Sequence, residues 1–399
     1  MTAILELLRS TPAARRFFAA YLQSSLGNGM GYVALVLIAL ERFHSAWAVA
    51  LVLIADLVPL MVLGPLLGGA ADRLPRRACA VGADLLRAVA FVGIAVVGGL
   101  APTLALAALA GVGNGIFNPA ALAGLPHLAG ERQAAATSLF GAISTLGKTV
   151  GPVIAAVILA GGGVEVALAV NGASFLVSAF LLASVDLGRA ESARATRGAP
   201  PASAVSLRAV AGFATIVAAS SGAALFAGIS NVAEPGFVTH DLGVAGAGFS
   251  IVVGVYGLGV AAGSLGGSRG GEVPRLWTRY LTGILALGAG MTFAGLSPAY
   301  SAALPAFALA GAGNGLLMVH ERLLIQGLVL ERALGRAFGT IDMVASWAFA
   351  ASLVLGAVAV AAAGSRWGLR IAGLGTVAMA MACALTVMRT QAEPAAEHS

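Results

Sequence analysis

About twelve long apolar segments, separated by short polar or Gly/Pro-rich breaks, constrain the fold of this 399-residue chain more than any other feature. A helix crosses the hydrocarbon core of a bilayer with about 20 residues, and each segment is that long. Lipid offers the backbone no hydrogen-bond partners, so each segment is expected to be helical. The sequence therefore predicts an all-α polytopic membrane protein. The segments fall at 16–40, 46–71, 78–100, 102–126, 134–161 and 164–187, and at 207–233, 244–268, 276–297, 301–327, 337–364 and 367–388.

The charge content supports this class. Only 10% of the residues are charged and 59% are hydrophobic, whereas a soluble domain is about 25% charged. The net charge of +6 comes from arginines in alternate loops, so we expect no nucleic-acid partner. Cys79 and Cys383 lie at opposite ends of the chain, so neither a disulfide framework nor a metal site is expected. The run from 17 to 40 is too long for the apolar core of a signal peptide and is expected to remain as the first span.

The arginines also predict the orientation, because cytoplasmic loops carry an excess of them. Their placement puts both termini on the cytoplasmic side of the cell inner membrane, with Arg366 and Arg370 as exceptions in a predicted outer loop. The Pro-, Ala- and Ser-rich stretch 188–206 predicts a flexible cytoplasmic linker. It would join a six-helix bundle at 1–187 to a second at 207–388, with a cytoplasmic tail at 389–399.

Short patterns in the first half recur about 200 residues later. AGVGNG at 110–115 recurs as AGAGNG at 310–315, and FGAIS at 140 recurs as FGTID at 338. The glycine pair at 68–69 recurs as a glycine pair at 266–267. Three echoes in order and at one offset indicate a parallel duplication of six-helix halves, as found in some transporter folds.

A charged turn, GPLLGGAADRLPRR from Gly64 to Arg77, joins two apolar segments. It resembles the G-x-x-x-D-R-x-G-R-R/K loop between the second and third helices of major facilitator superfamily transporters, although Pro75 replaces the usual second glycine. The matching positions are Gly68, Asp72, Arg73, Arg76 and Arg77.

Further stretches carry the resemblance along most of the chain. LGKTVGPV resembles the G-x-x-x-G-P motif of helix 5 in the antiporter branch, with Gly147, Gly151 and Pro152 in place. NPAALAGLP, NGASFLVSA and NVAEPGF resemble the macrolide-efflux and siderophore-export branch. Helix 4 lacks the arginine that many drug/proton antiporters carry. The resemblance implies two pseudo-symmetric six-helix bundles that rock around a site at the membrane midplane.

Ionisable side chains inside a span are costly and call for a reason. Asp56 is expected in the outer half of the second helix, either as a proton acceptor or cation-binding carboxylate, or as a carboxylate bonded to a neighbouring helix near the surface. On the tenth helix, Glu321 either titrates, with His320 or Arg322 tuning it, or forms a structural pair with Arg322. Lys148, the one lysine, is expected to face the cavity opposite Asp56 or Glu321, with snorkelling as the alternative.

Asp84 and Arg87 are three residues apart and share a helix face. The resemblance implies that they join the charged turn in a network that gates the cytoplasmic side. In the family arrangement Asn28 and Asn231 would line the cavity, with ordinary interhelical hydrogen bonding as the alternative. Glu234 lies near the end of its segment and is expected to be an interfacial carboxylate.

These features predict a secondary active transporter that works by alternating access, most simply a proton-coupled exporter of a small, moderately hydrophobic drug or secondary metabolite. Uptake or facilitated passage of a metabolite and a non-transporting membrane sensor are the alternatives. The sequence holds no P-loop and no metal or hydrolase motif, so we expect no enzymatic activity and no cofactor. The expected partners are a small-molecule substrate, protons and the lipid bilayer, and the protein is expected to be monomeric.

Overall fold

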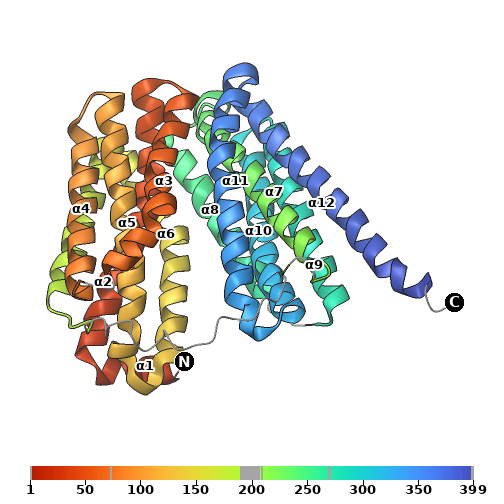
Figure 1. Cartoon of the computed structure of the whole chain (residues 1–399). Coiled ribbons are helices and arrows are strands. Elements are labelled where there is room, and N and C mark those ends of the chain that lie inside the picture. Colours follow the sequence, from red (N-terminus) through yellow and green to blue (C-terminus); the bar gives the residue numbers. More distant parts are fainter. Residues whose placement is uncertain (1, 72–73, 189–206, 208–209, 268–270, 397–399) are drawn as a thin grey trace. The chain divides into compact units, whose positions relative to one another are not determined.

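The computed structural model describes residues 2–71, 74–188, 207, 210–267 and 271–396, and these are almost entirely helical, without a strand. They form two compact units, Met1–Gly198 and Ala199–Ser399. Figure 1 labels the long helices of both units. The first unit contains α1 (Thr2–Ser10), α2 (Pro12–Phe43), α3 (Ala46–Ala71), α4 (Arg76–Val96), α5 (Leu100–Ala129) and α6 (Gln133–Ala183). The second contains α7 (Phe213–Gly236), α8 (Gly246–Gly266), α9 (Val273–Leu296), α10 (Tyr300–Leu328), α11 (Leu334–Ala363) and α12 (Ser365–Ala396).

The twelve predicted segments correspond to α2–α5, the two arms of α6, and α7–α12. The arms of α6 meet at Gly163, whose φ of 77° is open to glycine but strained for other residues. Eight helices or continuous helical runs in the described residues are long and apolar enough to cross a membrane, and Leu100–Ala183 counts among them as one run. The linker 189–206 lies outside the described residues. Helix α12 continues past the predicted end at 388 to Ala396.

The two units repeat the same packing pattern. In the first, α6 packs on α2 and α4, and α5 packs on α3 and α4. In the second, α7 packs on α11 and α12, α9 packs on α10 and α12, and α8 packs on α10. A Cβ added to Gly111 on α5 would lie 1.9 Å from the Asp56 carbonyl oxygen on α3, and one added to Gly311 on α10 would lie 2.1 Å from the Tyr256 carbonyl oxygen on α8. The internal repeat in the sequence therefore specifies equivalent helix contacts.

The G-x-x-x-G-P motif of α6 brings two helix backbones together. A Cβ at Gly147 would lie 2.4 Å from the Ser25 carbonyl oxygen on α2, and one at Gly29 would lie 2.2 Å from the Gly147 carbonyl oxygen. Gly151 approaches the same turn of α2. Small residues allow such close approach between membrane helices, where lipid supplies little hydrophobic driving force for association.

Gly29→Ala is expected to destabilise the protein by about 1–3 kcal/mol, because the new methyl group overlaps the α6 backbone. Gly141→Ala is the matched control, because a Cβ there meets nothing within 4 Å. Thermal unfolding of both purified variants in detergent measures the difference. Equal unfolding midpoints would contradict the close contact between α2 and α6.

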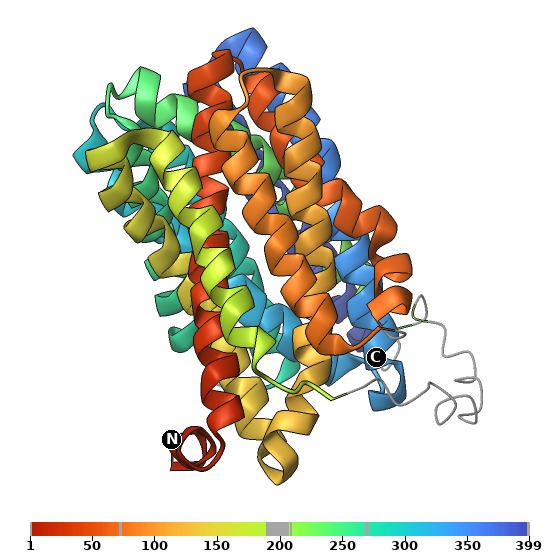
Figure 2. The ribbon, with the colours of Figure 1, turned by 90° about the vertical axis from the view of Figure 1, so that its left-hand side faces the viewer.

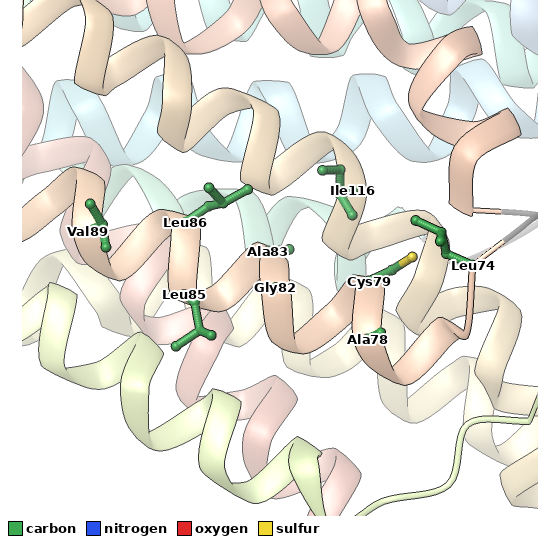
Figure 3. Close-up of a pocket in the computed structure, with 9 residues that line it drawn as sticks. All are labelled: Leu74, Ala78, Cys79, Gly82, Ala83, Leu85, Leu86, Val89 and Ile116. Atoms are coloured by element: carbon green, nitrogen blue, oxygen red, sulfur yellow. The ribbon is translucent and has the colours of Figure 1, made fainter.

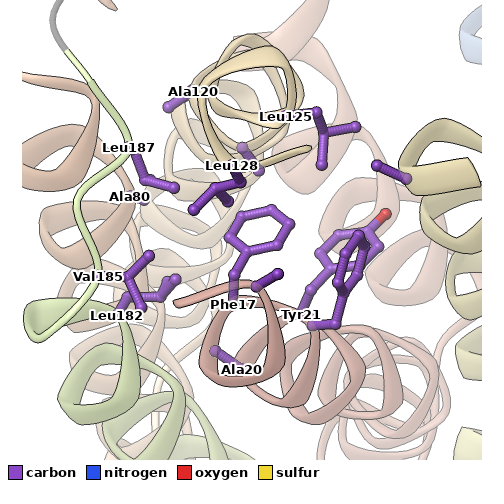
Figure 4. Close-up of a cluster of buried hydrophobic side chains, with 14 of the residues drawn as sticks. Phe17, Ala20, Tyr21, Ala80, Ala120, Leu125, Leu128, Leu182, Val185 and Leu187 are labelled. Atoms are coloured by element: carbon purple, nitrogen blue, oxygen red, sulfur yellow. The ribbon is translucent and has the colours of Figure 1, made fainter. Parts of the chain in front are cut away.

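An apolar cluster closes the end of the first unit at which α2 begins. It joins Phe17 and Tyr21 of α2, Leu125 of α5 and residues after α6, including Leu187 (Figure 4). Helix α1, which the sequence analysis does not predict, lies across this end of α2 (Figures 1 and 2). Its Leu7 is buried in the same cluster. A helix of nine residues is too short to register as a span, but its apolar residues follow a helical period.

Candidate functional site

Arg87 lies in the middle of α4 and has no exposed surface. Its guanidinium carbon lies 4.2 Å from the ring centroid of Phe117 on α5 and 4.3 Å from that of Phe175 on α6. Two aromatic rings at this distance attract the cation and restrict its movement. The sequence of α4 therefore buries an arginine and supplies it with partners from neighbouring helices.

The guanidinium bridges polar groups from three helices. Its Nη2 donates to the Asp84 carboxylate one turn away on α4, and both side chains are fully buried. Its Nη1 lies 3.3 Å from Oδ1 of Asn28 on α2 and 3.2 Å from Oδ1 of Asn114 on α5. Charge-assisted hydrogen bonds of this kind are stronger than neutral ones.

Asp56 on α3 completes the group. Its backbone packs against Gly111 of α5, two residues before Gly113, against which the Arg87 side chain packs, and its carboxylate interacts electrostatically with Arg87. The residue is half-buried, yet its Oδ1 is buried and finds no hydrogen-bond partner among the described residues. Oδ2 of Asp84 and Nε of Arg87 are also buried and have no hydrogen-bond partner among the described residues. We refer to Asp56, Asp84, Arg87, Asn28 and Asn114 as the Arg87 cluster.

The Arg87 cluster contains two carboxylates and one guanidinium. With both acids ionised it carries one net negative charge, and one added proton makes it neutral. A buried, uncompensated charge is strongly unfavourable, whereas a compensated pair is tolerated. The cluster therefore has the charge balance of a site that takes up and releases a single proton.

The described arginines of the charged turn do not reach Asp84 and Arg87. Asp84 and Arg87 contact neither Arg76 nor Arg77, because Arg87 lies about 16 Å further along the axis of α4 than Arg76. Instead, Nη1 of Arg76 donates to the Leu187 carbonyl oxygen at 3.4 Å, and Arg77 is exposed. Gly68 lies in α3, and Asp72 and Arg73 lie outside the described residues. A gating role of the turn stays a prediction.

The segment after α6 is anchored at the end of the first unit where α2 begins. Val185 and Leu187 are fully buried between the helix ends, and Asp186 between them is exposed. The Gly188 N–H donates to Oδ1 of Asp186 at 2.9 Å and holds the pKa of this carboxyl below its usual range, with help from His127, whose Nε2 lies 3.6 Å from Oδ2. The predicted linker therefore begins from a fixed point.

Residues 320–322 on α10 point in different directions, as expected for consecutive helical residues. The Ser220 hydroxyl on α7 donates to the Glu321 carboxylate and lies 2.9 Å from the hydroxyl of Tyr280 on α9. His320 is fully buried, with Nδ1 2.8 Å from the Leu316 carbonyl oxygen. Arg322 is exposed, and the described residues show no salt bridge between it and Glu321. Glu321 alone of the three joins a network between helices.

Two other predicted site residues have simpler surroundings. Lys148 is exposed on α6, because Gly147 and Gly151 take the face toward α2, and it forms no ion pair with Asp56 within the described part of the first unit. Asn231 is half-buried on α7, and its Nδ2 donates to the Ala227 carbonyl oxygen at 2.8 Å. The buried Pro152 belongs to the contact between α2 and α6.

The sequence alone does not predict Asn114 as a partner of Arg87, or Phe117 and Phe175 as its aromatic neighbours. In the family arrangement Asn114 would line the cavity, and its flanking glycines favour close helix packing at least as much. A recoverable signal is the spacing of Asn114 and Phe117, three residues apart and therefore on one face of α5. Ser220 and Tyr280, the neighbours of Glu321, give no local signal.

An apolar pocket of about 510 Å³ lies along one face of α4, between this helix and Ile116 of α5 (Figure 3). Leu74, Cys79 and Val89 lie along its length, and none of the predicted site residues lines it. Small-molecule sites usually combine apolar walls with a few polar groups that orient the ligand. The pocket lacks such groups, and the polar chemistry of the first unit lies in the Arg87 cluster.

Known proteins resemble this chain in sequence over part of its length. A Bacillus subtilis (strain 168) protein named as a bacilysin exporter, BacE, is 35% identical over 155 residues, which cover 38% of this chain and 39% of that protein. The multidrug efflux pump Tap of Mycolicibacterium fortuitum is 34% identical over 167 residues, or 39% of this chain and 41% of the pump. The chain thus spans about two fifths of the length of these relatives.

Solved structures show the fold. A bacterial homologue of the human lysosomal transporter Spinster, in an inward-facing and unoccupied conformation, superposes with a TM-score of 0.74 at 14% identity, covering 94% of this chain and 96% of that one. A POT family transporter in complex with 5-aminolevulinic acid gives a TM-score of 0.73 at 11% identity, with the same two coverages. Residues 17–233, more than half of the chain, match the Major Facilitator Superfamily. The chain is a multi-pass membrane protein that belongs to the Major Facilitator Superfamily.

Proposed function

We propose that the protein exports a small, moderately hydrophobic molecule across the cytoplasmic membrane in exchange for protons. Two partial relatives are named as exporters or efflux pumps, which supports the direction of transport. The observation that carries proton coupling is the Arg87 cluster, which holds two carboxylates and one guanidinium inside the first unit, with the guanidinium bonded to Asp84 and interacting electrostatically with Asp56. Ionisable groups inside membrane helices commonly mark proton relays.

Asp56 is the group that exchanges the proton. Asp84 is fully buried and its carboxylate accepts a hydrogen bond from Arg87, so its charge is already compensated. Asp56, by contrast, forms no ion pair in the described structure and holds a buried oxygen without a hydrogen-bond partner, so a proton there compensates a carboxylate that lacks a counter-charge in contact with it. Arg87 is fixed between two aromatic rings and serves as the stationary counter-charge.

The proton then determines which conformations are favourable. With Asp56 ionised, the net negative charge favours a conformation in which water reaches the carboxylate. With Asp56 protonated, the cluster is neutral and tolerates a dry environment while access changes sides. A proton acts as a ligand that shifts a conformational equilibrium in proportion to its differential affinity for the two states.

Glu321 is the second candidate for proton exchange, in the second unit. Its carboxylate accepts a hydrogen bond from Ser220, and Ser220 lies beside Tyr280. Hydroxyl groups can either donate to a carboxylate or accept from a carboxylic acid. The network therefore supports both protonation states of Glu321.

Transport in inverted membrane vesicles tests the proposal. An exporter moves substrate into such vesicles when their interior is acidic, so radiolabelled chloramphenicol, a neutral probe, is expected to accumulate and to leave when a protonophore collapses the gradient. Exchange without accumulation would indicate facilitated passage instead. Binding without any flux would indicate a membrane sensor, and either of these results would overturn the proposal.

A further inference from the structure

The second unit contains a buried carboxylate that belongs neither to the Arg87 cluster nor to the hydrogen-bond network of Glu321. Glu234, in the last turn of α7, is 9% exposed. The helix continues from it through a π-helical turn, Phe237–Asp241. The expected interfacial position concerns depth in the membrane and stays a prediction, whereas this burial shows that the unit itself encloses the side chain. A side chain of this kind is rarely buried unless it has a charged partner.

The second unit supplies no such partner among its described residues. Glu234 forms no ion pair there, and its polar neighbours are the side chains of Ser230 and Tyr256. The nearest arginine on α12, Arg366, donates to the Ser297 carbonyl oxygen at 2.6 Å and lies over the ring of Phe237 at 5.2 Å.

The other charged groups close to this end of α7 are also committed or exposed. Arg370 on α12 donates to the Gly295 carbonyl oxygen at 3.0 Å and lies over the ring of Trp367 at 4.8 Å. His240 and Asp241 at the end of the π-helical turn are exposed. The buried carboxylate of Glu234 therefore has no built-in cation in the described part of the unit.

The internal repeat shows that the second unit has no arginine at the position equivalent to Arg87. Tyr256 and Asn314 stand at the positions equivalent to Asp56 and Asn114, and they interact with each other. Gly113 lies against Arg87 in the first unit, whereas the equivalent Gly313 lies against Leu287. The first unit thus neutralises its carboxylates with an arginine, and the second replaces that arginine with an apolar side chain.

We propose that Glu234 binds the cationic group of a transported ligand. A desolvated carboxylate attracts an organic cation strongly, and Tyr256 of α8 interacts electrostatically with Glu234. A lipophilic organic cation fits better than a metal ion, because the described residues contain no group of metal-binding side chains at this place. This inference rests on the proposed function and adds organic cations to the neutral molecules that the same protein exports.

Equilibrium dialysis with the purified protein tests this site with a pair of probes, the tetraphenylphosphonium cation and the tetraphenylborate anion, which have nearly the same size and shape. The wild type is expected to bind the cation more tightly than the anion. Glu234→Gln is expected to weaken cation binding at least about tenfold, as expected for loss of one member of a desolvated charge pair, and to leave the anion unaffected. Glu331→Gln, at an exposed position of the same unit, is the control and is expected to behave as wild type.

A second measurement uses the unaltered chain and does not depend on the folding of a variant. Dicyclohexylcarbodiimide modifies buried carboxylic acids, and peptide mass spectrometry locates the product. Tetraphenylphosphonium is expected to protect Glu234 from modification, and tetraphenylborate is not. Equal binding of the two probes by the wild type, unchanged cation binding by Glu234→Gln, or equal modification of Glu234 with either probe would each overturn the proposal.

The two proposals fail in distinguishable ways. Chloramphenicol is neutral, so its gradient-driven accumulation tests proton-coupled export without involving the cation site. If chloramphenicol accumulates and the cation does not bind, the assignment of Glu234 is wrong and the export function stands. If the cation binds at Glu234 and chloramphenicol does not accumulate, the cation site stands and proton-coupled export is wrong.

Discussion

Replacing Arg87 with methionine is expected to destabilise the protein by about 3–5 kcal/mol, the usual cost of removing one partner of a buried ion pair. Methionine approximates the length of the arginine stem and keeps the contacts with Phe117 and Phe175. It leaves Asp84 fully buried without its counter-charge. It also leaves the amide oxygens of Asn28 and Asn114 without the guanidinium that donates to them. Thermal unfolding in detergent, followed by circular dichroism, measures the loss.

Two further variants separate the charge from the packing. Arg87→Met combined with Asp84→Leu is expected to recover most of the lost stability, because replacing a whole buried pair with apolar residues is often neutral or better. Arg77→Met, at an exposed position on the same helix, is expected to change stability by no more than about 0.5 kcal/mol. If Arg87→Met and Arg77→Met unfold alike, the Arg87 cluster does not stabilise the first unit.

The sequence predicts the helices well because lipid leaves the backbone few choices. A long apolar segment must satisfy its own hydrogen bonds, so length and hydropathy suffice to locate it. The same reasoning misses α1, which is too short to be a span. It does separate the two arms of α6, which meet at Gly163, where glycine permits the sharp turn. Hydropathy also underestimates the length of α12, which extends beyond the predicted end at 388.

Only part of the candidate site can be predicted from the sequence, because its side chains come from several helices. The spacing of Asp84 and Arg87 correctly predicts that they meet, because residues three apart share a helix face. Their partners Asn28, Asn114 and Asp56 come from three other helices, and only the packing of those helices brings them together. The repeated glycines identify which helix pairs approach closely but not which side chains fill the remaining space. Likewise, the burial of Glu234 cannot be inferred from its position near a helix end.

Asp56→Asn is expected to separate substrate exchange from proton coupling. Asparagine has the shape of a protonated aspartic acid but cannot release a proton, so the Arg87 cluster stays neutral in every conformation. Substrate exchange along its own gradient is expected to persist, because the neutral cluster permits the change of access. Accumulation driven by the pH gradient is expected to be lost, because no proton moves with each cycle.

The accumulation ratio of chloramphenicol in inverted vesicles tests this account most directly. A pH difference of one unit stores about 1.4 kcal/mol per proton, which supports about a tenfold ratio of a neutral substrate in one-for-one exchange. Glu331→Gln, at an exposed position of the second unit, is the control. We expect a ratio of about ten for the wild type and the control, and of about one for Asp56→Asn with exchange retained. A wild-type ratio in Asp56→Asn would show that the proton is carried elsewhere and would contradict the assignment of the Arg87 cluster as the coupling site.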